Sequence, residues 1–192
     1  RNGSLALLIL AFVGIFRISD LLMGVMANPF YIDMGFTLTE IGVVTKFYGT
    51  LATIMGAFSG GLLVVKFGIL RPLLLAAALL ALTNLPFAIL ASFGANLWLL
   101  AGTITADNFS AGLGGAVFIA YLSSLTNRLY TATQYALFTS LMTLPGKFLG
   151  GFSGILVDGY GYTKFFILAT LAGIPAICLV LLLMRSQARR LA

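Results

Sequence analysis

Six long stretches of apolar residues, separated by short polar breaks, constrain this chain more than any other feature. A membrane helix needs about 20 residues to cross a hydrocarbon core of about 30 Å, and each stretch is long enough. Because a membrane interior offers no water to backbone amides, such stretches must form helices. The sequence therefore predicts an all-α membrane protein, a single bundle over residues 1–192 with spans near 5–27, 40–65, 72–91, 97–125, 132–156 and 164–184.

Charged residues are too few to cover a soluble surface. They make up 8% of the chain, whereas soluble domains have roughly 25%, and 60% of the residues are hydrophobic. The chain has no histidine and a single cysteine, Cys178. These counts exclude a disulfide framework, the usual zinc sites and Ser-His hydrolytic sites, so we expect no cofactor and no enzyme. The chain opens on Arg1 rather than methionine, which we interpret as an internal boundary of a longer protein.

The basic residues outside the spans lie mostly on one side of the expected membrane. With six spans, both termini share that side with the second and fourth connections; it holds Arg1, Lys66, Arg71, Arg128, Arg185, Arg189 and Arg190, against Lys164 on the other. Cytoplasmic loops carry the excess of lysine and arginine, so both termini are predicted to be cytoplasmic. The net charge of +6 then needs no nucleic-acid partner to explain it.

Five charged residues fall inside the predicted spans, namely Arg17, Asp20, Lys46, Asp107 and Lys147. Each costs roughly 2.5–3.5 kcal/mol near the centre of a membrane helix, so we expect them to face one another or water. Arg17 and Asp20 are three residues apart and share a helix face. Two interpretations are open for them: a self-neutralising structural pair, or the lining of a cavity that binds substrate or transfers a proton.

The same charges indicate what a cavity would bind. Asp107, which is followed by Asn108 and a glycine-rich turn, and Asp20 are candidates to gain and lose a proton during transport. The three basic residues exceed the two acidic ones by one positive charge. Fields inside a low-dielectric cleft are poorly screened, so the pattern favours an anionic substrate.

Two of the predicted helices begin with similar sequences. The second span begins with Thr37 to Glu40 and the fifth with Thr131 to Gln134, and both have the form of a capping box. Each span also has a glycine pair near its end, Gly60-Gly61 and Gly150-Gly151. The likeness predicts a three-plus-three arrangement, because transporters often carry inverted repeats.

Glycines also form small faces on these two spans. They recur at Gly42, Gly49, Gly56 and Gly60 in the second, and at Gly146, Gly150 and Gly154 in the fifth. Small faces let membrane helices approach closely. Static packing and a sliding or rocking contact both require such a surface, and the spacing does not choose between them.

The prolines are expected either to separate spans or to kink them. Pro29, Pro72 and the stretch 92–96 are predicted to mark breaks between spans, because proline lacks an amide proton and short polar residues favour turns. Pro86, Pro145 and Pro175 instead fall within spans, where neighbouring helices tolerate a kink.

The connection from Gly61 to Arg71 resembles the loop signature of the major facilitator superfamily. Gly61, Lys66, Gly68 and Arg71 match its glycine and basic positions, and Val65 stands where the signature has an acid. The resemblance implies that these residues form a gating loop. The stretch from Gly154 through Asp158 to Gly161 resembles a related element of the same superfamily.

A resemblance to AmpG-type muropeptide permeases spans nearly the whole chain. Its carriers are Arg17 to Asp20, Val44 to Lys46 with Leu51 to Ile54, the helix around Asp107-Asn108, and Ala132 to Leu137. It implies the carboxy-terminal half of a 12-helix transporter in the bacterial inner membrane, with the amino-terminal half as partner. It also implies proton-driven import of anhydro-muropeptides for cell-wall recycling. The charges inside the spans, with Asn108 beside Asp107, give the candidate substrate-binding or proton-coupling residues: Arg17, Asp20, Lys46, Asp107, Asn108 and Lys147.

Other functions fit parts of the pattern. The cargo of such a transporter is alternatively a coenzyme A ester, another anionic metabolite or a drug. From a different class, an intramembrane aspartyl protease would use Asp20 and Asp107, although neither follows the Gly-x-Gly pattern of those enzymes. A scaffold that transports nothing would use the buried charges for stability alone.

Overall fold

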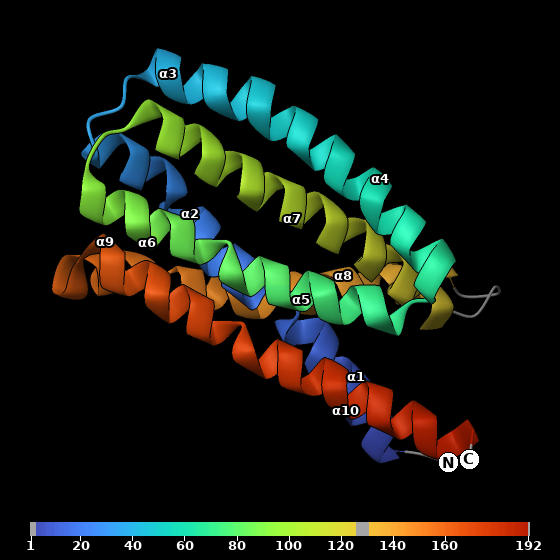
Figure 1. The fold of residues 1–192 in the computed structure, drawn as a ribbon. Coiled ribbons are helices and arrows are strands. Elements are labelled where there is room, and N and C mark those ends of the chain that lie inside the picture. Colours follow the sequence, from blue (N-terminus) through green and yellow to red (C-terminus); the bar gives the residue numbers. More distant parts are fainter. Residues whose placement is uncertain (1–2, 126–130, 192) are drawn as a thin grey trace.

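The computed structural model describes residues 3–125 and 131–191, with side chains described for 7–125 and 133–186. These residues form helices joined by short connections (Figure 1). The helices are α1 (Gly3–Ile15), α2 (Ile18–Asp33), α3 (Leu38–Val43), the π-helix η1 (Val44–Gly49), α4 (Thr50–Phe67), α5 (Leu70–Leu82), α6 (Asn84–Phe93), α7 (Leu97–Leu125), α8 (Thr131–Gly150), α9 (Ser153–Ala172) and α10 (Ile174–Leu191).

Within the described residues, five helical segments are long and apolar enough to cross a membrane. They are Leu7–Asp33, Leu38–Phe67, Leu70–Phe93, Leu97–Leu125 and Ser153–Ser186. The prediction of an all-helical chain with several such segments is confirmed. The fifth predicted span, 132–156, falls on α8 and the beginning of α9 and is not among the five.

Local sequence explains where several helices begin and end. At the start of α3, the Thr37 hydroxyl accepts a bond from the amide of Glu40 at 3.3 Å, and the Glu40 carboxylate accepts one from the amide of Thr37 at 2.8 Å. This confirms the predicted capping box, whereas the side chain of Thr131 lies outside the described residues. Gly68, with φ of 74°, ends α4, because that backbone conformation strains other residues.

The prediction for Pro29 was wrong. Pro29 lies inside α2, which continues to Asp33. The first four amides of a helix need no partner, so proline is tolerated there, but Pro29 lies farther along. Membrane helices accept this interruption when neighbouring groups satisfy the freed carbonyl. The chain turns instead after Met34, where Gly35 has φ of 90°.

Three membrane-length segments are interrupted in their interiors. The breaks fall at Phe16–Arg17 between α1 and α2, at Thr83 between α5 and α6, and at Gly173 between α9 and α10. Pro86 and Pro175 follow the second and third breaks closely. Neither proline has an amide proton to donate to the preceding turn, so the backbone ladder is lost there.

Glycines bring α4 and α7 into backbone contact. A Cβ atom on Gly56 would overlap the carbonyl of Phe109, and one on Gly112 would overlap the carbonyl of Thr53. A Cβ on Gly60 would lie 2.8 Å from the carbonyl oxygen of Leu113. The predicted small face of this span is therefore a packing surface along Gly56 and Gly60, whereas Gly42 has nothing within 4 Å of such an atom.

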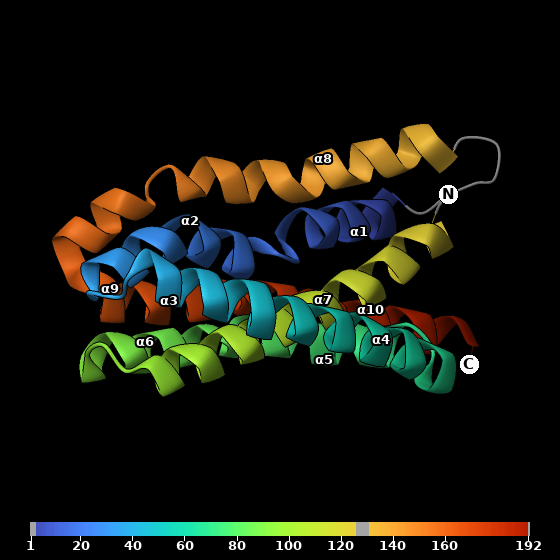
Figure 2. The same cartoon turned by 90° about the horizontal axis from the view of Figure 1, so that it is seen from above.

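Two of the three glycines predicted to form the small face of the fifth span, Gly146 and Gly150, make room for side chains of α2, whereas Gly154 has nothing within 4 Å of an added Cβ atom. Added Cβ atoms would collide with Leu21 at Gly146 and would lie 2.9 Å from Val25 Cγ2 at Gly150. Figure 2 shows α8 running alongside α1 and α2. The contact is made by small residues, as membrane helices require in the absence of a hydrophobic drive.

The buried apolar side chains form two separate clusters. The first joins α1, α5, the second half of α7 and α10, through residues such as Phe12, Leu73 and Val117. The second joins α2, α6, the first half of α7 and α9, through residues such as Phe30 and Phe166. The start of α1, the end of α10 and the α4–α5 turn lie at one end of the bundle, and the α2–α3 and α6–α7 connections lie at the other (Figures 1 and 2).

Candidate functional site

Arg17 and Asp20 form an ion pair at the first break. Arg17 precedes α2, and its Nη2 donates to Asp20 Oδ2 one turn along. The two side chains are 27% and 13% exposed, so the pair is largely shielded. It is the one ion pair among the side chains that the structure describes. Because a membrane interior penalises isolated charges, this pairing makes both tolerable there.

Asp107 of α7 lies within electrostatic range of both members of this pair. The Thr83 hydroxyl is close to the Asp107 carboxylate, and it is buried without a hydrogen bond of regular geometry to any group in the described part of the chain. Tyr31, buried in the second cluster, is also within electrostatic range of Asp107. Two acids and one base from two different spans therefore form one group, which we call the charged cluster: Arg17, Asp20 and Asp107.

Asn108 faces a different helix from its neighbour Asp107. Its Oδ1 accepts a bond from the Thr53 hydroxyl at 3.2 Å, and its Nδ2 donates to the Ile104 carbonyl at 2.9 Å. Its amide also packs against Gly49, where a Cβ atom would lie 3.3 Å from Nδ2. Asn108 thus ties α7 to the start of α4 and does not contribute to the charged cluster.

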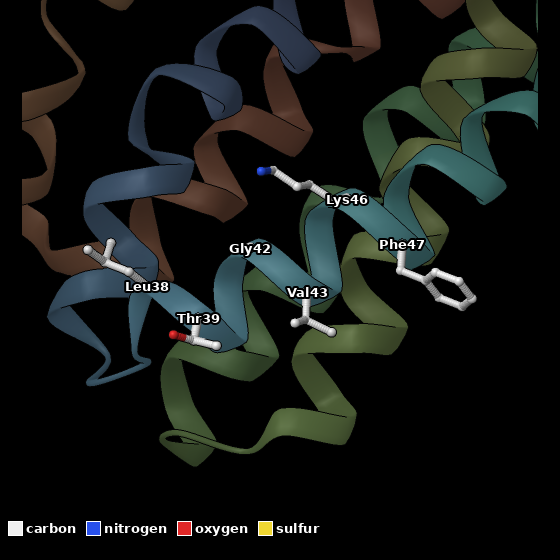
Figure 3. A pocket seen from close by; sticks show the side chains of 6 residues that line it. All are labelled: Leu38, Thr39, Gly42, Val43, Lys46 and Phe47. Atoms are coloured by element: carbon white, nitrogen blue, oxygen red, sulfur yellow. The ribbon is translucent and has the colours of Figure 1, made fainter.

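Lys46 lies apart from the cluster, on the π-helix η1. It lines an open groove of about 630 Å³ together with Leu38, Thr39, Gly42, Val43 and Phe47. Figure 3 shows its side chain pointing away from Val43 and Phe47. The ammonium group is exposed and forms no ion pair with any described side chain. π-Helices are rare and occur frequently at functional sites.

Lys147 is also exposed, in the last turn of α8. It forms no ion pair within the described residues. The structure therefore brings together three of the five charges expected inside the spans and leaves two lysines exposed on separate helices. Bulk water weakens the attraction of an exposed lysine for an anion, so that attraction is stronger when another part of the protein covers the site.

The predicted gating loop is a tight turn at the end of α4. Gly61 and Arg71 are exposed, and Gly68 with Ile69 forms the whole connection to α5. The Lys66 ammonium lies 5.2 Å from the centre of the Phe67 ring, a cation–π distance. Neither Lys66 nor Arg71 pairs with a described acid.

The charges that predicted the orientation are only partly described. Arg1 and Arg128, with the side chains of Arg189 and Arg190, lie outside the described residues. At the opposite end of the bundle, the Tyr162 hydroxyl donates to Asp33 Oδ2 at 2.6 Å and joins α9 to the end of α2.

Four polar residues around the charged cluster were not singled out from the sequence: Ser19, Tyr31, Thr83 and Asn84. The signal for two of them was present, since Thr83-Asn84 interrupts an apolar run just before Pro86. Ser19 and Asn84 are 2% and 1% exposed. A buried asparagine in a membrane span requires partners, which is a reason to look for them.

Nearly the whole chain is similar to curated bacterial transporters. It is 34% identical over 178 residues, 93% of its length, to "Putative transporter AmpG 4" of Rickettsia felis. It is 31% identical over 182 residues to "Anhydromuropeptide permease" of Escherichia coli strain K12. It spans 43% and 37% of the lengths of these two relatives. No protein-family model matches the chain. The resemblance to AmpG-type permeases is confirmed, and with the apolar helices it identifies a multi-pass membrane protein.

Proposed function

From the premise that the chain is homologous to AmpG-type transporters along 93% of its length, we propose that it is one half of a secondary transporter, not an enzyme. The cargo we propose is an anhydro-muropeptide, which the relative in Escherichia coli is named for. Import would be driven by protons across the bacterial inner membrane. The chain would be the carboxy-terminal half, because the residues it shares with such permeases resemble that part.

The charged cluster is the observation that carries this proposal. Asp20 and Asp107 come from different spans and interact inside the bundle, with Arg17 as the only described base paired to either. Two carboxylates sharing one guanidinium cannot both be fully neutralised, so one of them is suited to take up a proton. We assign proton coupling to this cluster, and anion binding to the exposed Lys46 and Lys147.

The helix contacts support a six-span bundle built as three plus three. We count α8 with the first turns of α9 as the fifth span, since Gly161 with φ of 77° interrupts α9. The glycine face of the second span then packs on the fourth, and that of the fifth packs on the first. The third and sixth spans pack on each other, α5 with α10 and α6 with α9. If the first three spans are exchanged for the last three, the contact between the second and fourth spans becomes the contact between the fifth and first, and the contact between the third and sixth is unchanged. An inverted repeat requires this symmetry.

The orientation proposal rests on the ends of the bundle. The start of α1, the end of α10 and the α4–α5 turn with Lys66 and Arg71 share one end (Figure 1). Asp33 and Asp158 belong to helix segments that meet at the other end. Lysine and arginine mark the cytoplasmic side, so we place both termini there.

Uptake by the full-length protein tests the proposal. The protein is reconstituted in liposomes, an acid-outside pH gradient is imposed, and labelled anhydro-muropeptide is added. We expect accumulation above the external concentration, and loss of that accumulation when a protonophore collapses the gradient. Absence of uptake, or uptake of equal extent without the gradient, would reject it.

Competition separates the muropeptide from other cargoes. Unlabelled muropeptide in excess is expected to suppress the labelled signal, whereas a coenzyme A ester or a cationic drug at the same concentration is not. Suppression by the coenzyme A ester alone would keep the transporter and replace its substrate.

A further inference from the structure

A hydrogen-bonded pair of buried side chains lies where three spans are interrupted. Asn84 Nδ2 donates to Ser19 Oγ at 2.7 Å, and Ser19 Oγ donates to the Ala169 carbonyl at 2.7 Å. Ser19 is in the first turn of α2, Asn84 begins α6, and Ala169 is in the last turn of α9. Each of the three positions borders one of the interior helix breaks.

The break at Thr83 explains why an asparagine is useful at position 84. Pro86 has no amide proton to donate to the Leu82 carbonyl, so the helical ladder is interrupted at the end of α5. In the same turn, Asn84 Nδ2 donates to the carbonyls of Leu80 and Ala81, at 3.1 Å each. This arrangement fixes which way the Asn84 amide is turned. With oxygen and nitrogen exchanged, Oδ1 would face two carbonyl oxygens and the Ser19 hydroxyl, whose proton is already donated to Ala169.

The pair also fixes the segment that carries the ion pair. Ser19 stands between Arg17, which precedes α2, and Asp20 in its first turn, so a bond that holds Ser19 restrains the backbone from which both charged side chains project. The two hydrophobic clusters meet the chain on either side of this turn: Phe16 belongs to one and Met23 to the other.

We propose that Asn84 is a positioning residue for transport: through Ser19 it holds the first turn of α2 so that Arg17 and Asp20 face Asp107. The inference rests on the proposed function and deepens it by extending the coupling machinery to a third span. Asn84 touches neither the ion pair nor Asp107 through any described hydrogen bond, so its effect is exerted through Ser19.

The experiment compares two modes of transport in the full-length protein. Gradient-driven accumulation requires net proton movement, whereas exchange of labelled for unlabelled muropeptide at equal pH does not. We measure both for Asn84→Ala, Ser19→Ala and the double variant in proteoliposomes. Each single variant is expected to lower accumulation about tenfold and to change exchange by less than about twofold, and the double variant to do no worse than the poorer single one, because coupled residues are not additive.

Ser153→Ala is the matched control. Ser153 is buried at 0% exposure, and its hydroxyl has no hydrogen-bond partner among the described groups. The Ser153→Ala change removes the same hydroxyl group as Ser19→Ala from an equally buried position, but it breaks no hydrogen bond. Accumulation and exchange should therefore both match the wild type. Asp20→Asn supplies the positive control, because it should show the same split between accumulation and exchange.

The outcomes are distinct. Unchanged accumulation in both single variants, or equal loss of accumulation and exchange, would overturn the positioning role. If Asn84→Ala does not fold, Ser19→Ala decides, since it leaves the bonds from Asn84 to Leu80 and Ala81 in place. Failure of both to fold would assign the pair to the fold alone. A wild type that accumulates no muropeptide would reject the proposed function and, with it, this inference.

Discussion

Asp107 and Asn108 are consecutive in α7 and serve different neighbours. Asp107 interacts with the Arg17–Asp20 pair, whereas Asn108 accepts a hydrogen bond from Thr53 of α4. Successive residues point about 100° apart around a helix, so one turn of α7 faces both partners. Substitutions at these two positions should therefore change different properties of the protein.

We predict that Asp107→Asn removes proton-driven uptake and leaves the protein folded. The amide is the same size as the acid but neither ionises nor takes up a proton, so coupling is lost while exchange at equal pH persists. Uptake and exchange in proteoliposomes measure the two. Asp158→Asn, at an exposed position of α9, should retain both, and retained accumulation in Asp107→Asn would exclude Asp107 as the proton carrier.

For Asn108→Ala the expected loss is stability. Removal of the amide leaves the Thr53 hydroxyl bonded only within its own span, to the Gly49 carbonyl of η1 at 2.9 Å. A typical net hydrogen bond contributes about 1 kcal/mol, so the free energy of unfolding should fall by about that amount. Reversible unfolding in detergent micelles measures it, with transport per folded molecule as the control. A large change in KM with unaltered stability would instead place Asn108 at the substrate.

The ion pair predicts non-additive substitutions. Arg17→Ala leaves Asp20 without its partner, and the unfolding free energy should fall by about 2–3 kcal/mol, the scale of an unpaired charge in a membrane helix. Arg17→Ala combined with Asp20→Asn removes both charges and should be more stable than Arg17→Ala alone. If the double variant loses the sum of the two single effects, the pair contributes no coupling energy.

Two glycines of α7 offer a matched comparison. Gly112→Ala would drive a methyl group into the backbone of Thr53, and overpacking of this kind costs about 1–3 kcal/mol. Gly102→Ala lies on the same helix at an exposed place with nothing within 4 Å, so alanine should be neutral or stabilising there by up to about 1 kcal/mol. Thermal unfolding of the two purified variants checks the difference, and equal midpoints would contradict the close α4–α7 packing.

Lys46→Gln should weaken substrate binding. A unit charge 4 Å from an anion contributes about 1 kcal/mol in water and more in a shielded groove, so KM should rise about fivefold or more with little change in the maximal rate. Initial uptake rates over a range of muropeptide concentrations give both constants. Lys164→Gln, an exposed position of α9, should leave KM unaltered. An unchanged KM in Lys46→Gln would show that the groove beside it does not hold the anion.

The membrane-length segments of the described residues were predictable from sequence because hydrocarbon length and backbone satisfaction limit the choices, but the predicted span 132–156 is not among them. The segment 97–125 matches α7 at both ends. The break at Phe16–Arg17 was not predicted, because an apolar run carries no period that distinguishes a straight helix from an interrupted one, whereas kinks were expected at Pro86 and Pro175. Proline position was a partial guide: Pro86 and Pro175 mark breaks, whereas Pro29 is accommodated within α2.

Individual residues of the site were easier to predict from the sequence than their arrangement in space. The three-residue spacing of Arg17 and Asp20 sufficed to predict their shared face, and the ion pair follows from it. Asp107 faces the pair and Asn108 faces α4 because of how α7 is rotated about its axis. The close packing of Gly112 against α4 sets this rotation. The partners of Ser19 and Asn84 lie far away in the chain, so no local pattern indicates them.

Proton movement that accompanies substrate tests the central claim most directly. Liposomes containing the full-length protein are suspended in weakly buffered medium without a pH gradient, anhydro-muropeptide is added, and the external pH is recorded. Symport predicts that the medium becomes more alkaline as substrate enters, and that Asp107→Asn abolishes the change. Entry of substrate at constant external pH would contradict the account.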